Sequence, residues 1–279
     1  MKIGIVGLGL IGGSLGFDFK QSGHTVLGVA RRHTTCEAAI ALAAVDYAST
    51  SLASLAAAEV VFICTPIAVI ESTAIDLIPH LQPETVITDV GSVKAAIVDA
   101  ITNHWPNFIG GHPMAGKTEV GIEAAEPKLF ADRAYVLTPT AQTPGPAVTI
   151  VTQLAESLNA KVFVCSPEVH DRAVSWISHL PVMVSSSLIQ VCLQEPDPKV
   201  RELAQQFASS GFRDTSRVGG GHPELGVMMA HYNRAEVLRA LQAYRQEIDC
   251  LTQLVREEQW DAIAAKLTEN RQARPRFLK

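Results

Sequence analysis

The stretch that decides the fold is KIGIVGLGLIGG, at residues 2–13. A β-rich apolar run comes first, and the glycines at 7, 9 and 12 then have the spacing G-x-G-x-x-G at the start of a helical stretch. Gly7 allows a tight turn, Gly9 lets a pyrophosphate approach the backbone, and Gly12 lets the helix pack closely on the strand. The free N–H groups of the helix N-terminus then face the diphosphate. We predict a dinucleotide site formed by Gly7, Gly9, Leu10, Ile11 and Gly12.

Short apolar runs alternate with helical stretches through the first part of the chain. Continuous apolar strands separated by helices are typical of a mostly parallel sheet covered on both faces. After about Ser166 these runs stop, and helical periodicity covers 198–209 and 223–267. We therefore predict an α/β chain, with a Rossmann-like nucleotide-binding domain at residues 1–165 and an all-α helical domain at 166–279. The predicted strands lie at 2–6, 25–29, 60–64, 85–90, 108–109, 135–137 and 162–165.

The composition limits the class of protein. The 279 residues are 47% hydrophobic and 18% charged with a net charge of −5, so we expect a packed core and no general nucleic-acid binding. The five cysteines are scattered and never spaced as C-x-x-C, which indicates reduced thiols and no metal site. No uninterrupted apolar run reaches the ~18 residues of a membrane span, and glycines interrupt the apolar N-terminal stretch. We expect a cytoplasmic protein that has a small-molecule substrate and no membrane partner.

The end of the second predicted strand indicates which dinucleotide binds. An NAD-preferring site usually has an acidic residue roughly 20 positions after the glycines, where it holds the ribose 2′-hydroxyl. Here Ala30 is followed by Arg31 and Arg32, so no acid repels a 2′-phosphate and two guanidinium groups can pair with it. We predict NADP as the cofactor, with solvated loop arginines as the alternative. Thr65 and Pro66, which end the third run, are expected to line the same site.

Two further segments follow strand ends at the sheet edge that carries the glycine loop. They are DVGSVK at 89–94 and GGHPMAG at 110–116. Ligands of open α/β sheets bind at this edge. The imidazole of His112 can accept a proton from an alcohol while hydride leaves for a nicotinamide. A purely structural histidine in a glycine-rich loop is the alternative.

Together with three later motifs, these segments resemble the prephenate/arogenate dehydrogenases of tyrosine biosynthesis. The later motifs are HD at 170–171, SHLP at 178–181 and GFRDTSR at 211–217, in the order found in that family. The resemblance covers nearly the whole chain. It implies a Rossmann-like domain followed by a helical domain that pairs two subunits into a homodimer. It also implies an oxidative decarboxylation, in which a cyclohexadienol ring loses hydride to NADP+ and CO2 from the opposite carbon, without a metal.

The resemblance implies roles for individual residues. His112 matches the catalytic histidine that hydrogen-bonds the ring hydroxyl, and Ser92 matches the serine beside that hydroxyl and the nicotinamide. Arg217 matches the arginine that binds a substrate carboxylate, while Asp214 and His179 match polar residues that line or order the pocket. Structural roles stay open: a helix N-cap for Ser92, a core histidine for His179, and an ion pair between Asp214 and Arg217. No role beyond structure is predicted for three other histidines, His170, His222 and His231.

The sequence departs from many relatives at two pocket positions. Val182 stands where many have a second histidine after SHLP, and Gly226 stands where many have an aromatic residue, three positions after Pro223. Both changes alter the expected pocket wall, so the choice between arogenate and prephenate is open. By analogy with compact, NADP-dependent relatives, we expect an arogenate dehydrogenase, with prephenate dehydrogenase as the alternative.

Two other interpretations compete with this one. The β-hydroxyacid dehydrogenases and imine or ketoacid reductases share the two-domain plan, but they usually employ a lysine of the helical domain as acid/base. Here Lys199 is the only lysine of that domain before Lys266, and it lies in a charged stretch. A non-catalytic NADP-binding sensor would need the glycine loop, but it would not need Ser92, His112 and Arg217 to converge.

Overall fold

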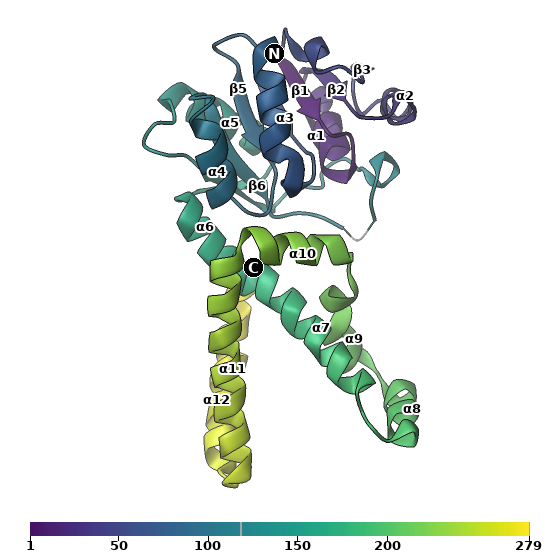
Figure 1. The fold of residues 1–279 in the computed structure, drawn as a ribbon, viewed down its shortest axis with the longest axis vertical. Coiled ribbons are helices and arrows are strands. Elements are labelled where there is room, and N and C mark those ends of the chain that lie inside the picture. Colours follow the sequence, from purple (N-terminus) through teal and green to yellow (C-terminus); the bar gives the residue numbers. More distant parts are fainter. Residues whose placement is uncertain (118, 279) are drawn as a thin grey trace. The chain divides into compact units, whose positions relative to one another are not determined.

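The computed structural model describes residues 1–117 and 119–278. Within them the chain forms an eight-stranded sheet with the order β3-β2-β1-β4-β5-β6-β7-β8 (Figure 1). Neighbouring strands are parallel except for β6 and β7, which are antiparallel. The strands are β1 (Lys2–Val6), β2 (Thr25–Val29), β3 (Tyr47–Ser49), β4 (Val60–Ile63), β5 (Val86–Asp89), β6 (Phe108–Pro113), β7 (Ala134–Thr138) and β8 (Lys161–Val164).

Helices cover both faces of this sheet. In β4, Val60 and Phe62 belong to one apolar core and Val61 and Ile63 to the other, because successive side chains of a strand point to opposite faces. The helices are α1 (Leu10–Gln21), α2 (His33–Ala41), α3 (Ile70–Leu77), α4 (Ala95–Thr102) and α5 (Gly145–Ser157), with short 3-10 turns η1 (Leu52–Leu55), η2 (Ile67–Val69), η3 (Ile78–His80) and η4 (Ile122–Ala124). The predicted Rossmann-like architecture is confirmed.

Two strands differ from the prediction. Strand β3 was not predicted, because its three residues are exposed or half-buried and form no apolar run. Strand β6 continues to Pro113, so His112 lies inside a strand that pairs with Val136 of β7, and not in a loop. Continued pairing with β7 explains why the glycines at 110 and 111 do not end the strand.

The glycine loop forms a close turn between β1 and α1. Gly7 has a φ of 101° and donates its N–H to the Val29 carbonyl at 2.8 Å. A Cβ on Gly12 would lie 2.1 Å from the Gly7 carbonyl oxygen, so helix and turn approach each other closely. A Cβ on Gly9 would meet no described atom within 4 Å, so the space in front of Gly9 is open.

Every described element after β8 is a helix or a helical turn. Helix α6 (Pro167–Val174), the π turn η5 (Ser175–His179) and α7 (Leu180–Leu193) form one continuous helix of 27 residues. By length and composition alone this helix could cross a membrane, although helices in protein cores meet the same criterion, and 17% of its apolar window is buried. The next elements are α8 (Pro198–Phe207), α9 (Ser210–Ser216), the 3-10 turn η6 (Arg217–Gly220) and α10 (Pro223–Tyr232).

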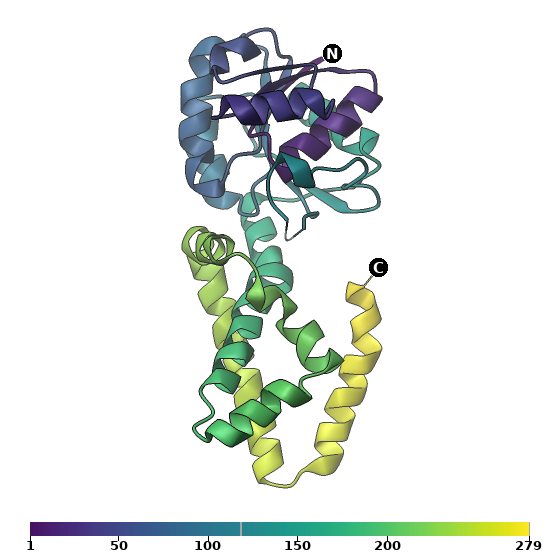
Figure 2. The ribbon, with the colours of Figure 1, turned by 90° about the vertical axis from the view of Figure 1, so that its right-hand side faces the viewer.

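The chain divides into two compact units, Met1–Asn233 and Arg234–Lys279. The second unit is a hairpin of α11 (Arg234–Arg256) and α12 (Trp260–Ala273), ending in the 3-10 turn η7 (Arg274–Phe277) (Figure 2). An ion pair of 2.8 Å between Lys266 and Glu247 links the two helices of the hairpin. A domain boundary between residues 165 and 166 stays a prediction.

A buried ion pair connects β5, β6 and α4. The side chains of Asp89, the last residue of β5, and Lys94, which precedes α4, pair while fully buried. Lys94 Nζ also donates to the Gly111 carbonyl of β6 at 2.8 Å, and Asp89 accepts from the N–H groups of Gly91 (2.8 Å) and Gly111 (3.2 Å). Burial lowers the pKa of Lys94, and the charge of Asp89 acts in the opposite direction.

We expect Lys94→Met to lower the free energy of unfolding by roughly 3–5 kcal/mol, because it leaves the Asp89 carboxylate buried without its cation. The measurement is urea unfolding followed by circular dichroism. Lys20→Met is the matched control, since Lys20 pairs with Asp46 at 3.1 Å in a partly exposed position. The control should lose at most about 1 kcal/mol. Equal losses for both variants would contradict the prediction.

Candidate active site

The predicted site residues of the first domain gather at one edge of the sheet. The glycine turn follows β1, Arg31 follows β2, Thr65 follows β4 and Ser92 follows β5, all at the carboxyl ends of parallel strands. His112 lies near the carboxyl end of β6, which runs parallel to β5. The same edge therefore carries the open glycine turn and a buried histidine.

Residues 30–32, which follow β2, include two exposed cations and no acid. Ala30 is buried, whereas Arg31 and Arg32 are exposed at the start of α2. In the described part of the chain, neither guanidinium group forms an ion pair. Thr65 Oγ1 is buried without a hydrogen-bond partner among the described residues.

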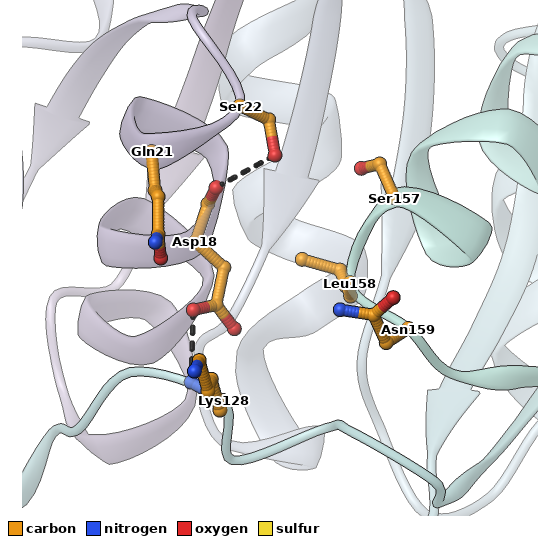
Figure 3. Close-up of a pocket in the computed structure, with 7 residues that line it drawn as sticks. All are labelled: Asp18, Gln21, Ser22, Lys128, Ser157, Leu158 and Asn159. Atoms are coloured by element: carbon orange, nitrogen blue, oxygen red, sulfur yellow. Dashed lines mark hydrogen bonds between the residues drawn. The ribbon is translucent and has the colours of Figure 1, made fainter.

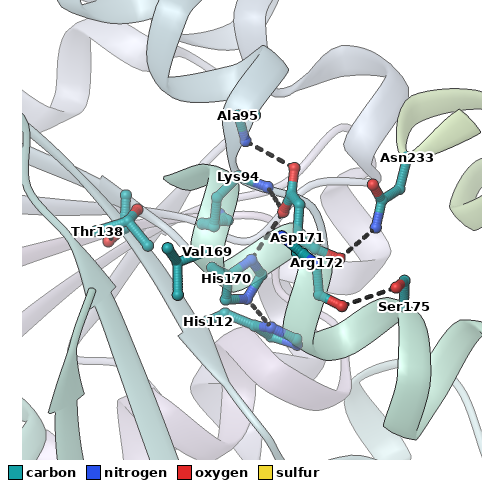
Figure 4. Close-up of polar contacts among 12 residues, drawn as sticks. Lys94, Ala95, His112, Thr138, Val169, His170, Asp171, Arg172, Ser175 and Asn233 are labelled. Carbon is teal, nitrogen blue, oxygen red and sulfur yellow. Dashed lines mark hydrogen bonds and ion pairs between the residues drawn. The ribbon is translucent and has the colours of Figure 1, made fainter. Parts of the chain in front are cut away.

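His112 belongs to a chain of hydrogen bonds that sequence analysis missed (Figure 4). His112 Nδ1 lies 2.8 Å from His170 Nε2, and His170 Nδ1 lies 2.8 Å from Asp171 Oδ1. Asp171 also accepts from the backbone N–H groups of Lys94 (2.7 Å) and Ala95 (2.9 Å). His170 was predicted to be structural only. The adjacent Asp171 was the one feature of the sequence that could have indicated this hydrogen-bonding role of His170.

His112 is suited to accept a proton. It is 8% exposed, and burial lowers the pKa of its imidazole well below the ordinary value. His170, Lys94 and His179 add to this lowering of the pKa. His112 is therefore neutral at pH 7, with one ring nitrogen free of a proton.

His179 lies at the end of the π turn and is fully buried. A π turn holds an extra residue, which changes the direction of the side chains that follow. The Nδ2 group of Asn233 lies 2.8 Å from the Asp171 carbonyl and 3.1 Å from His179 Nδ1. A carbonyl only accepts, so Asn233 donates through this nitrogen and His179 Nδ1 is an acceptor.

The remaining nitrogen of His179 is therefore a donor. Burial lowers the pKa of His179 to about 4, against the opposing charge of Asp171, so the ring is neutral and carries its proton on Nε2. This Nε2 group is buried without a partner among the described residues. Buried polar groups in proteins are rarely left unpaired, so this N–H group is available to a water molecule or a ligand.

Ser92 also presents an unpaired group. Its Oγ is buried and has no partner among the described residues. It does not cap α4, because the N-cap position is Lys94 and no side-chain cap hydrogen bond is present there. The hydroxyl of Ser92 is therefore available to a ligand beside the strand end.

Arg217 lies on a turn that packs tightly against α7. Ser185 Oγ of α7 donates to the Thr215 carbonyl at 2.8 Å and accepts from the Gly219 N–H at 2.9 Å. A Cβ on Gly219 would lie 2.3 Å from the Ser186 backbone nitrogen. The backbone on both sides of Arg217 is thus fixed, while its side chain is exposed.

Asp214 lies apart from the histidine network. Its side chain is 71% exposed and pairs with Arg213 at 3.2 Å, and not with Arg217. Among residues 1–117 and 119–278, no hydrogen bond or ion pair joins Asp214 or Arg217 to His112. The structure therefore brings Ser92 and His112 to one edge, and His179 lies near enough to lower the pKa of His112, but no direct contact joins Asp214 or Arg217 to His112 in the described residues.

The two positions that depart from relatives are neighbours. A Cβ on Gly226 of α10 would lie 3.6 Å from Val182 Cγ1 of α7.

Lys199, the lysine considered for the competing reductase interpretation, is exposed on α8. This helix follows the end of α7 that is far from the sheet (Figure 1).

A separate small cavity of about 140 Å³ lies between the ends of α1 and α5 (Figure 3). Asp18 accepts there from the Lys128 backbone N–H at 2.8 Å, and burial raises the pKa of its carboxyl group. Ser157 and Asn159 lie between the end of α5 and β8, and none of the predicted site residues lines this cavity. Its lining residues are Asp18, Gln21, Ser22, Lys128, Ser157, Leu158 and Asn159.

Comparison with known proteins assigns the chain to a family. Residues 15–164 match the prephenate dehydrogenase nucleotide-binding domain, and residues 166–269 match the prephenate dehydrogenase dimerization domain. The chain is 33% identical over 264 residues to the prephenate dehydrogenase of Bacillus subtilis (strain 168), a match covering 91% of this chain and 70% of that protein.

Solved structures agree with this assignment. The crystal structure of Synechocystis arogenate dehydrogenase is 49% identical, with a TM-score of 0.91 over 99% of this chain and 100% of that one. The prephenate dehydrogenase from A. aeolicus in complex with hydroxyphenyl propionate and NAD+ is 26% identical, with a TM-score of 0.93 over 98% and 97% of the two chains. These matches confirm the predicted resemblance: the chain belongs to the prephenate dehydrogenase family.

Proposed function

We propose that the chain is an NADP-dependent arogenate dehydrogenase of tyrosine biosynthesis. The observation that carries the proposal is a neutral, buried imidazole, that of His112, at the sheet edge where the glycine turn opens. The 49% identity to Synechocystis arogenate dehydrogenase, over the full length of both chains, favours arogenate as the substrate. Prephenate, which would give 4-hydroxyphenylpyruvate, is the alternative substrate.

The residues at the first strand ends fit an NADP molecule. The open space at Gly9 suits a pyrophosphate, and the unpaired Arg31 and Arg32 suit a 2′-phosphate. The proposed cofactor residues also include Leu10, Ile11, Ala30, Thr65 and Pro66, with Gly7 and Gly12 shaping the turn. Bound there, NADP+ supplies the hydride acceptor.

The side chains of the chain itself bind and orient the substrate and move one proton. His112 takes the proton of the ring hydroxyl, and the electron pair of the broken O–H bond forms the C=O bond as hydride leaves the same carbon. Loss of CO2 makes the ring aromatic, and the proton returns from His112 to the ring oxygen. The reaction therefore needs no net proton, and aromatisation drives it.

The unpaired groups of the site match the polar atoms of such a substrate. Ser92 Oγ is proposed to contact the ring hydroxyl, and His179 Nε2–H is a donor for a carboxylate or carbonyl oxygen. Arg217 is proposed to bind a carboxylate, with Asp214 ordering the same loop. Val182 and Gly226 make one part of the wall small and apolar, and we propose that they influence side-chain recognition.

The helical part of the chain supports a homodimer. Exposed apolar side chains on α6 to α8 leave a surface that a second copy would cover, and the matching family domain is described as a dimerization domain. We also propose a cytoplasmic location, because all five cysteines are free. The exposed apolar residues include Val169, Ile177, Val191, Leu193, Val200 and Phe207.

The first test is reduction of NADP+ and of NAD+ by purified protein, with arogenate and with prephenate in turn. We expect turnover with arogenate and NADP+. Turnover with prephenate would correct the substrate but keep the chemistry. Absence of reduction in all four mixtures, with NADP+ still bound, would favour a non-catalytic sensor.

The double variant Arg31→Ala/Arg32→Ala should raise the KM for NADP+ and leave the KM for NAD+ nearly unchanged.

His112→Asn should lower kcat by about 10²–10⁴-fold, because it removes the proton acceptor. The dissociation constant for NADP+, measured by fluorescence titration, should stay the same, since the glycine turn is untouched. His104→Asn is the control, because His104 is exposed after α4. Normal turnover of the His112 variant would remove this residue from the mechanism.

Activity should persist below pH 6.5, the ordinary pKa of a histidine. Burial lowers the pKa of His112, so the ring stays neutral and able to accept a proton until the pH falls through the lowered value. The measurement is kcat/KM against pH in buffers of constant ionic strength. An acidic limb at or above pH 6.5 would show that the base is a different group.

A further inference from the structure

We propose that His170 and Asp171 are positioning residues that hold the His112 ring in a single tautomer. In this tautomer Nδ1 carries the proton and Nε2 carries the lone pair, so Nε2 is the atom that receives the substrate proton. The assignment of His112 as the base rests on the proposed function. The tautomer itself follows from the hydrogen bonds and can be measured without turnover.

The Asp171 carboxylate accepts hydrogen bonds from two backbone N–H groups. Its Oδ1 accepts from the Lys94 N–H and its Oδ2 accepts from the Ala95 N–H. These N–H groups belong to the first turn of α4, where the helix itself offers no acceptors. Both carboxyl oxygens thus accept from backbone N–H groups, which stabilise the ionised carboxylate, and an ionised carboxylate only accepts hydrogen bonds. His170 Nδ1, 2.8 Å from Oδ1, must therefore donate.

The hydrogen bond between His170 and His112 then determines the tautomer of His112. With its proton on Nδ1, the neutral His170 ring has its lone pair on Nε2, which lies 2.8 Å from His112 Nδ1. Two lone pairs cannot face each other at this distance, so His112 Nδ1 carries the proton. The Nε2 atom of His112 then has the lone pair, as a general base requires.

The charges around the two rings favour this arrangement over its competitor. The competitor is a cationic His170 that donates to both neighbours and leaves the proton of His112 on Nε2. His170 is 1% exposed. Asp171 already accepts two hydrogen bonds from backbone N–H groups and interacts with the positive charge of Lys94. A charge on His170 would therefore be buried beside a carboxylate that other groups already neutralise in part.

The direct test is imidazole ¹⁵N NMR of the full-length protein labelled with ¹⁵N-histidine. Spectra of His112→Asn and His170→Gln assign the two rings by loss of their signals. We expect His112 with a protonated Nδ1 and an unprotonated Nε2, and His170 with the same pattern. A proton on His112 Nε2, or a doubly protonated His170, would overturn the proposal. Either result would leave the proposed dehydrogenase function standing, and turnover of the native enzyme tests that function separately.

Two matched variants test the link to turnover. In His170→Gln a carbonyl oxygen can occupy the place of Nε2 and still accept from His112. In His170→Asn the amide nitrogen can occupy the place of Nδ1 and satisfy Asp171, but His112 loses its acceptor. We expect kcat within about tenfold of native for the glutamine variant, and a loss on the order of 10²–10⁴-fold for the asparagine variant. The KM should be unchanged in both.

The melting temperature separates positioning from folding. Both variants remove the same ring, so a purely structural role would lower kcat and melting temperature in parallel and equally. Equal kcat values in the two variants, whether high or low, would contradict the proposal. A selective loss of kcat in His170→Asn, with melting temperatures alike, would support it.

Discussion

The structure depends on the pairing of a few buried charged side chains at one edge of the sheet. The Asp89 carboxylate and the Lys94 ammonium group are fully buried, and each would be costly alone. Their pairing fixes the ends of β5 and β6 and the start of α4. Asp171 then reaches across from α6 to the first N–H groups of α4. The first helix after the sheet is thereby tied to the strand ends that carry the candidate site.

This arrangement gives two histidines opposite hydrogen-bonding roles. His179 accepts from Asn233 at Nδ1 and therefore presents a donor, whereas His112 is proposed to present an acceptor. Burial keeps both rings neutral. The difference between them comes from the neighbour on the other ring nitrogen, and not from the residue type. Environment assigns the role, as it does for pairs of carboxylates in many active sites.

The glycine turn between β1 and α1 could be predicted from local sequence. Residues 2–13 contain a strand, a turn and a helix start in direct succession, so the spacing of their glycines fixes the geometry. The absence of an acid after Ala30 is also a local signal. The short strand β3 escaped prediction because it carries no apolar pattern. The position of His112 inside β6 escaped because pairing with a distant strand, β7, extends β6 beyond its apolar residues.

The surroundings of His112 and His179 depend on contacts between residues far apart in the chain. The sequence by itself determined the α/β class, the helical part, the glycine turn and the candidate His112, because each follows from periodicity or from motifs of a few residues. Only the tertiary structure decided that His170 lies behind His112, that Asn233 orients His179, and that Val182 faces Gly226. The physical reason is that a buried polar group must find a partner wherever the packed chain provides one, and that partner is set by the fold as a whole.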